Sequence, residues 1–342
     1  MHLLRLLLLA FLFAPNLGFA GRDLNHGTLS IYFENDLFTG TDRYYTNGVK
    51  LGWSSIDLER YSQSPYASLL LPVLERIPFI NNPAFQKNIS FSLGQNIYTP
   101  DNTEALERLD DDRPYGGWLY LGFGVVWKNA QIRHSLNLNV GVVGSWSYAE
   151  EAQRIVHETR GLDVPKGWDN QLHNELGVVL AYEATWRWPR HERRVGLDWE
   201  FLPHLGFSAG NVQTFANLGG EFRFGLNLPD DFGTPGIEAA SATPTPVEGQ
   251  QRADAPRKFD LGVYLFARAD GRAVARNIFL DGNTFGNSAS ADRTPLVADL
   301  SVGASINYHN TKFTYAVTYR TKEFEAQEEA QLFGSISLNF PF

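Results

Sequence analysis

The chain has 342 residues, of which 38 are acidic and 29 basic, so its formal net charge is −9. This acidic balance excludes a general nucleic-acid-binding role, because proteins of that class present basic surfaces to the phosphate backbone. The complete lack of cysteine excludes a disulfide framework as the source of stability. Stability must therefore come from side-chain burial or from a closed hydrogen-bonded sheet.

The N-terminus has the pattern of a secretory signal peptide. A basic start that includes Arg5 precedes the apolar run 6–13, and a small-residue segment ends at Ala20. The apolar run is too short to span a bilayer as a helix, which favours a cleaved signal over a membrane anchor. We predict a signal peptide over residues 1–20 and a single mature domain over residues 21–342.

Most of the remaining chain alternates between apolar and polar residues with a period of two, as β-strands do. Near the C-terminus, for example, Phe313, Tyr315 and Val317 alternate with small or polar residues. Twelve such runs occur, at residues 27–36, 45–56, 87–98, 115–128, 131–147, 174–188, 194–208, 211–226, 258–271, 295–308, 312–323 and 331–342. Their even number and their length favour a bacterial outer-membrane barrel over a water-soluble sandwich, whose strands are usually shorter.

We therefore predict an all-β fold, a twelve-stranded antiparallel transmembrane β-barrel with both termini in the periplasm. The terminal aromatic residue Phe342 is typical of outer-membrane barrels. A closed barrel has no free sheet edge that needs a partner, so we expect a monomer in the bacterial outer membrane.

The connections fall into two groups if the N-terminus is periplasmic. The predicted extracellular loops are 37–44, 99–114, 148–173, 209–210, 272–294 and 324–330. Two periplasmic connections are long. Residues 57–86 are predicted to hold a short helix around Leu69 to Pro72, and residues 227–257, which are rich in Pro, Gly, Ala and Thr, are predicted to be flexible.

The first extracellular loop and its strand ends, residues 35–48, are rich in carboxylate, amide and hydroxyl groups. Loops held on a rigid base of strands often carry binding or catalytic groups, although polar residues also fill ordinary loops. The alternation places Asn35 on the same face as Ile31 and Phe33, which is the lipid face, and Asp36 on the inner face.

A helix is predicted over residues 150–160, stopped by Gly161. His157 lies near its C-terminal end and Asp163 follows two residues after the stop, so the two side chains can converge on one site. On the residues of this loop alone, the pattern favours an exposed loop histidine and a turn aspartate just after the helix. Because no Gly-x-Ser-x-Gly or His-Glu-x-x-His pattern occurs, hydrolysis would need an activated water, with His157 as base. Oxygen ligands such as Asp36 and Asp163 would suit calcium better than zinc.

The sequence resembles the lipid A 3′-O-deacylase family of Gram-negative outer membranes. The resemblance rests on Asn35-Asp36, the run from Asp42 to Gly48, Ile97-Tyr98-Thr99-Pro100 and the loop from His157 to Trp168, and it spans nearly the whole mature chain. It implies a twelve-stranded barrel and a calcium-dependent enzyme, a hydrolase of carboxylic esters. Its substrate would be lipid A of lipopolysaccharide in the outer leaflet, from which the enzyme removes the 3′-linked acyloxyacyl group.

The resemblance also implies the site residues. The family's catalytic positions fall on Asn35, Asp36, Thr46, His157 and Asp163 of this sequence, with Asp36 and Asp163 as the implied metal ligands. Two features depart from the family pattern. Asp163 stands where the family has a glutamate, and an acidic segment, residues 101–112, replaces a basic loop.

Two alternative functions remain open at the level of sequence. An outer-membrane phospholipase would need a serine on the rim near His157, for which Ser145 and Ser147 are the nearest candidates. A small porin or a binding barrel would need no catalytic group at all, although large polar side chains are expected to fill much of a twelve-stranded lumen.

Overall fold

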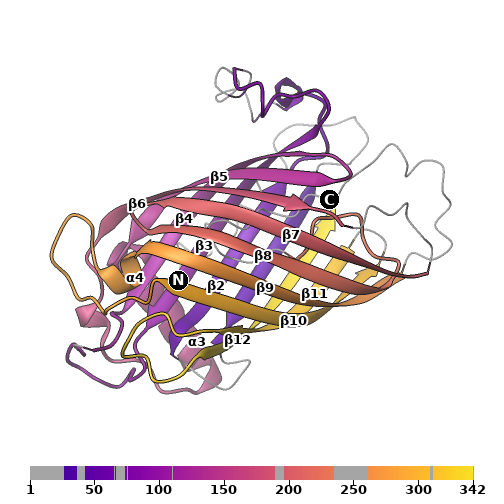
Figure 1. Cartoon of the computed structure of the whole chain (residues 1–342). Helices are drawn as coiled ribbons and strands as arrows, with labels where there is room; N and C mark the ends of the chain where they lie inside the picture. The colour runs from indigo at the N-terminus through magenta and orange to yellow at the C-terminus, as the bar shows by residue number, and fades with distance from the viewer. Residues whose placement is uncertain are drawn as a thin grey trace.

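The structure is a computed structural model of the chain, shown in Figure 1. It describes residues 27–36, 43–64, 66, 74, 76–109, 111–188, 196–234, 261–308 and 311–341. The predicted signal peptide lies outside these residues, as does the short helix predicted around Leu69 to Pro72.

The described residues form twelve antiparallel strands that close into one barrel, in which each strand pairs with its sequence neighbours and β1 pairs with β12. The strands are β1 (Thr28–Asn35), β2 (Tyr44–Ser54), β3 (Gln86–Thr99), β4 (Gly116–Lys128), β5 (Ile132–Val143), β6 (Glu175–Trp186), β7 (Leu197–Gly210), β8 (Gln213–Leu226), β9 (Leu261–Asn277), β10 (Leu296–Tyr308), β11 (Thr311–Arg320) and β12 (Gln331–Pro341). The fold class, the number of strands and the antiparallel closure predicted from the alternation are therefore confirmed.

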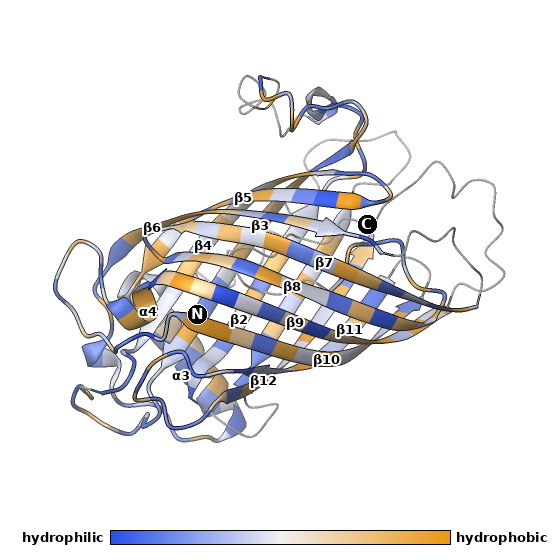
Figure 2. Ribbon diagram, viewed as in Figure 1, coloured by the Kyte–Doolittle hydropathy of each residue, from blue (hydrophilic) through white to orange (hydrophobic). Residues whose placement is uncertain are grey.

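The alternation separates two faces of the barrel wall. Large apolar side chains such as Leu121, Leu218 and Leu265 are exposed on the outer face, and Figure 2 shows apolar positions alternating with polar ones along the strands. Buried polar side chains such as Lys50 and Glu221 point the other way. This is the inverse of a water-soluble protein and is the pattern of a barrel that faces lipid outside.

The predicted helix is present as α3 (Ala149–Arg160), and it ends at Gly161, whose φ is +69°. The strand before it is shorter than predicted. β5 ends at Val143 because Gly144, at φ +87°, leads into the short 3₁₀ helix η5 (Ser145–Ser147). The strand β9 is longer than the predicted run and continues to Asn277.

The connections lie at two ends of the barrel, as predicted. α3 and the four-residue helix α4 (Ile278–Asp281) lie at one end, here called the outer rim (Figure 1). The 3₁₀ helix η6 (Trp168–Asn170) belongs to the same connection as α3. At the opposite end, Thr28 pairs with Pro341, so the first and last described strands have their chain ends together, and η3 (Tyr61–Gln63) lies in the β2–β3 connection there. Among the described residues, no helix is both long and apolar enough to cross a membrane.

The lumen is filled by charged side chains that pair with one another. Near the outer rim, Asp299 on β10 accepts hydrogen bonds from Arg272 on β9 and from Arg320 on β11. Arg113 donates to Glu323 over a distance of 3.2 Å. Arg272, Asp299 and Arg320 come from three neighbouring strands, whereas Arg113 and Glu323 belong to the β3–β4 and β11–β12 connections, so buried ion pairs link the wall to the rim connections at this level.

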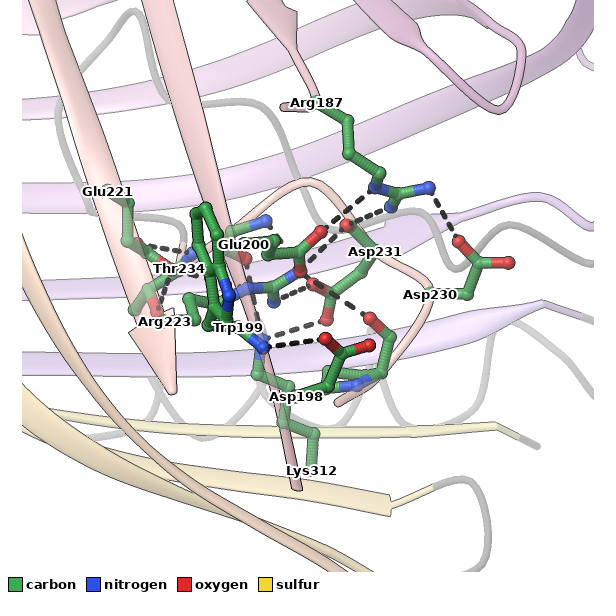
Figure 3. Close-up of polar contacts among 12 residues, drawn as sticks. Arg187, Asp198, Trp199, Glu200, Glu221, Arg223, Asp230, Asp231, Thr234 and Lys312 are labelled. Carbon is green, nitrogen blue, oxygen red and sulfur yellow. Dashed lines mark hydrogen bonds and ion pairs between the residues drawn. The ribbon is translucent and has the colours of Figure 1, made fainter. Parts of the chain in front are cut away.

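At the opposite end, the first part of the predicted flexible connection folds into the barrel. Residues 230–234, here called the plug segment, follow β8, and residues 235–260 lie outside the described chain. The buried Asp231 accepts from Lys312 Nζ on β11 at 2.9 Å and pairs with Arg223 on β8 (Figure 3). The next residue, Phe232, packs under the guanidinium of Arg133 on β5, which lies 5.9 Å from the ring centroid.

The plug segment therefore spans the lumen. β5 and β11 are six positions apart in a ring of twelve strands, which makes them opposite walls of the barrel. Two consecutive residues, Asp231 and Phe232, contact both walls. Thr234 adds a main-chain hydrogen bond to Glu221 on β8 at 2.9 Å, and Arg268 on β9 donates to the carbonyl oxygen of Thr234.

Candidate active site

A β-bulge at Thr46 shapes the first part of the candidate site. Between β2 and β3, Tyr45 pairs with Tyr98 and Asn47 pairs with Ile97, so Thr46 is an extra residue on β2. A bulge interrupts the alternation of side chains and re-aims the residues beside it. The buried Thr46 hydroxyl lies 2.7 Å from the hydroxyl of Thr99 on β3.

The register places polar residues on the outer face of the barrel wall, at the outer rim. Asn35 pairs with Asn47, Asn47 with Ile97, and Ile97 with Gly117, and directly paired residues share a face. This row continues the outer face that carries Leu121 on β4. Asn35 therefore lies on the lipid side of the wall, as its alternation predicts.

Helix α3 covers this row from outside the barrel. A Cβ added to Gly117 would lie 2.2 Å from Ala149 Cβ and 2.2 Å from Ser147 Oγ, so the start of the helix rests directly on β4. Gln95 Nε2 on β3 donates to the carbonyl oxygen of Ser147 at 2.6 Å. Ile97 packs in one apolar cluster with Ala149. The site residues on this face are thus enclosed between a helix and the wall.

This packing predicts the effect of a substitution at Gly117. In Gly117→Val, the added side chain cannot fit under Ala149 and Ser147, so we expect α3 to be displaced while the barrel still closes. Ester hydrolysis should fall at least about tenfold, because small displacements of catalytic groups are costly. Protease sensitivity of residues 149–160 and heat-modifiable gel migration would be measured together. Wild-type hydrolysis with an unaltered helix would contradict this account.

The buried residues of α3 are Ala149, Gln153 and His157, spaced four apart on the face toward the wall. His157 is 2% exposed. From Ala149 to His157 the helix rises about 12 Å, which matches the width of two to three strand spacings of about 4.8 Å. The start of α3 lies over β4 and β3, and His157 lies at the far end of the helix.

The structure fixes the orientation of the His157 ring. Its Nδ1 lies 2.6 Å from the main-chain oxygen of Asp163. A carbonyl oxygen can only accept a hydrogen bond, so Nδ1 is the protonated nitrogen and, in the neutral ring, Nε2 carries the lone pair. A base for activating water needs this tautomer, held by a partner behind it.

The carboxylates predicted as metal ligands lie in different environments. Asp36 follows β1 directly and is fully buried, and its Oδ2 accepts from the main-chain N–H of Arg43 at 2.6 Å. Arg43 in turn pairs with Asp101 and Glu329, which ties three rim loops together. The side chain of Asp163 is exposed. Asp163 therefore contacts His157 through its main-chain oxygen and not through its carboxylate. The type of side chain at position 163 does not predict this contact.

Within the described part of the chain, no three His, Asp or Glu side chains gather in a cluster that could hold a metal ion. A metal at this site would need other oxygen donors. Asn35, with an amide oxygen, directly precedes Asp36 and pairs with Asn47, and Thr46, with a hydroxyl oxygen, directly precedes Asn47. Calcium accepts such mixed oxygen sets together with water and main-chain carbonyls, so the donor chemistry fits calcium.

Two residues that the sequence analysis did not name as site residues, Gln153 and Trp168, lie beside His157 in the candidate site. Gln153 lies one helical turn before His157 on the same buried face, and Trp168 donates its Nε1–H to Gln153 Oε1 at 2.9 Å. The Trp168 ring packs against Tyr115, with centroids 4.8 Å apart. The four-residue spacing of Gln153 and His157 was a signal present in the sequence, whereas the pairing with Trp168 depends on the tertiary fold.

The serines required by a phospholipase are engaged elsewhere. Ser147 Oγ is buried and donates to the carbonyl oxygen of Gly144, and Ser145 Oγ donates to Asn174 Oδ1. Both precede the first turn of α3, at the opposite end of the helix from His157. A serine–histidine pair is therefore not formed by these two residues.

Comparison with known proteins decides the family. A family model described as outer membrane protein LpxR matches residues 4–342, which is nearly the whole chain. The chain belongs to the LpxR family. LpxR membership agrees with the barrel, and the protein is an outer-membrane protein, as predicted from its strands.

A solved structure of an LpxR protein agrees with this fold. LpxR from Salmonella typhimurium has a TM-score of 0.71 at 21% sequence identity, covering 92% of this chain and 100% of that chain. At this identity the likeness shows the fold. The β-domain of the Bordetella autotransporter Brka has a TM-score of 0.43 at 10% identity, covering 92% and 98% of the two chains. No curated protein matched the sequence.

Proposed function

We propose that this LpxR-family protein is a calcium-dependent esterase that removes the 3′-linked acyloxyacyl chain of lipid A in the outer leaflet. The observation that carries the proposal is the position of His157. It is a buried histidine with one protonated nitrogen fixed, held by a helix against the lipid-facing side of the wall. A lipid ester at the membrane boundary can approach that face without entering the lumen.

The proposed chemistry uses a water molecule as nucleophile. His157 Nε2 accepts a proton from the water while the water oxygen attacks the ester carbonyl carbon, giving a tetrahedral oxyanion. The intermediate then breaks its bond to the sugar oxygen, which takes the proton from His157. The products are a free carboxylic acid and a sugar hydroxyl, and His157 returns to its neutral form. The Asp163 carbonyl orients the imidazole throughout.

A calcium ion would be held by Asp36, with Asn35 and Thr46 as supporting oxygen donors. When bound, it supplies positive charge that polarises the ester carbonyl. Asp163 is assigned the positioning contact through its main-chain oxygen rather than a carboxylate contact, because its side chain is exposed.

Metal removal tests this assignment. Chelation of purified protein in mixed micelles with lipid A should lower ester hydrolysis at least about 100-fold, since one polarising group is worth several kcal/mol. Added calcium should restore the rate and added zinc should not, because the donors are oxygens. Asp36→Asn should raise the calcium concentration needed. Full activity after chelation would refute the calcium requirement.

The structure gives no support to the alternative of a small porin. The plug segment contacts opposite walls of the lumen, and ion pairs such as that of Arg320 with Asp299 fill the level above it. A conducting pore needs a continuous water path, and these contacts lie across the lumen through which that path would run.

A further inference from the structure

Gln153 has a donor group that the fold orients but does not use. The side chain is 3% exposed, on the face of α3 that rests against the barrel wall. Its Oε1 accepts from Trp168 Nε1 at 2.9 Å. The indole can only donate, so Oε1 and Nε2 of the amide are assigned without ambiguity.

The amide nitrogen of Gln153 has no hydrogen-bond partner among the described residues. A buried donor without a partner destabilises a fold, and Gln153 Nε2 shares this state with other buried atoms of the described residues, such as Trp118 Nε1 and Trp127 Nε1. Here the donor belongs to the helix face that also carries His157. The N–H of Gln153 is therefore held in place where it can donate to an acceptor that comes from a bound ligand.

The spacing of Gln153 and His157 fits an ester. Side chains four residues apart on a helix have Cβ atoms about 5–6 Å apart and lie on one face. An ester whose carbonyl oxygen accepts from Gln153 Nε2 would place its carbonyl carbon next to a water bound to His157 Nε2. The separation of the two side chains leaves room for the hydrogen bond from Gln153 to the ester, the hydrogen bond from the water to His157, and an attack distance of about 3 Å between the water oxygen and the carbonyl carbon.

We propose that Gln153 is a further substrate-binding residue, whose amide N–H donates to the carbonyl oxygen of the ester under attack. The inference rests on the proposed esterase function and adds a donor beside the metal. The hydrogen bond strengthens as the carbonyl oxygen becomes an oxyanion, so its effect falls on kcat rather than on KM. Trp168 is then a positioning residue that acts through Gln153.

The test compares purified Gln153→Glu with wild type, His157→Gln and the exposed control Glu151→Gln on lipid A in mixed micelles. Glu at position 153 keeps the acceptor for Trp168, replaces the N–H donor with an oxygen and, when ionised, adds a negative charge next to the proposed oxyanion. We expect kcat to fall about 10²–10³-fold with KM within about twofold of wild type. The control should keep the wild-type rate, because residue 151 is exposed.

A second variant separates binding from folding. Trp168→Phe keeps the Gln153 amide and the packing on Tyr115 but removes the indole donor, and we expect a smaller fall in kcat of about tenfold, again without a change in KM. Heat-modifiable migration reports the folded barrel for each variant. If Gln153→Glu does not fold, Trp168→Phe decides the question.

The outcomes distinguish this inference from the function on which it rests. Wild-type kcat in Gln153→Glu or, where that variant does not fold, in Trp168→Phe, with an inactive His157→Gln, would overturn the role of Gln153 and leave the esterase intact. A fall confined to KM would also overturn it. Absence of hydrolysis by the wild-type protein would instead refute the proposed function.

Discussion

His157→Gln should hydrolyse lipid A about 10³-fold more slowly than wild type. Glutamine keeps a polar side chain of similar size but cannot take a proton from water, and general-base catalysis contributes about 10²–10⁴-fold. The effect should appear in kcat, measured as the initial rate of fatty-acid release from lipid A in mixed micelles with saturating calcium.

The matched control is His173→Gln. His173 also lies in the β5–β6 connection, but its side chain is exposed and it is remote in sequence from α3. We expect this variant to keep the wild-type rate. Equal losses in both variants would indicate a general disturbance of the rim, and a fully active His157→Gln would remove His157 from the mechanism.

Asp231→Asn should destabilise the barrel by about 3 kcal/mol and open its lumen, because removing one partner of a buried ion pair leaves its charge uncompensated. Asp231 pairs with both Arg223 and Lys312, and the side chains of these two bases are almost fully buried. Urea unfolding in detergent would measure the free energy of unfolding. Planar bilayer recordings should show conductance events in the variant and none in wild type.

Asp230→Asn is the control for this prediction. Asp230 pairs only with Arg187 among the described groups, and its side chain is 29% exposed. The substitution Asp230→Asn should therefore lower the free energy of unfolding by much less than Asp231→Asn does. A silent bilayer and unchanged unfolding in Asp231→Asn would contradict the assignment of residues 230–234 as a plug.

The pH dependence of the plug follows from the pKa of Asp231. Burial by itself raises this pKa, but the charges of Lys312 and Arg223 outweigh burial and hold it well below the usual range of a carboxyl group. A depressed pKa in the folded state stabilises the protein above the unfolded pKa of about 3.9 and ceases to do so only as the pH falls through the folded value. The plug should therefore stay closed at pH 5.

The barrel was predictable from sequence because a strand that faces lipid on one side and the lumen on the other leaves a strict period-two pattern. The residues at which the strands end were harder to predict from the sequence. Gly144 and the bulge at Thr46 change the backbone locally, and neither alters the average alternation around it. The filled lumen was expected, whereas the fold of residues 230–234 depends on partners from the four strands β5, β8, β9 and β11.

The candidate site was predictable only in part. Spacing identified the helix, its stop at Gly161 and the proximity of His157 to Asp163. It did not reveal that α3 packs on the outside of the wall, because that depends on the absence of a side chain at Gly117. Nor did it show that Asp163 contacts His157 through a main-chain oxygen, since any residue at that position has one.

The most direct test of the central claim is mass spectrometry of lipid A from Gram-negative cells that express either wild type or His157→Gln. The account predicts that lipid A loses the mass of one 3′-linked acyloxyacyl unit in wild-type cells and keeps it in the variant. Both proteins should show the heat-modifiable migration of a folded barrel. Unchanged lipid A in both strains, with folded protein in each, would contradict the proposed esterase.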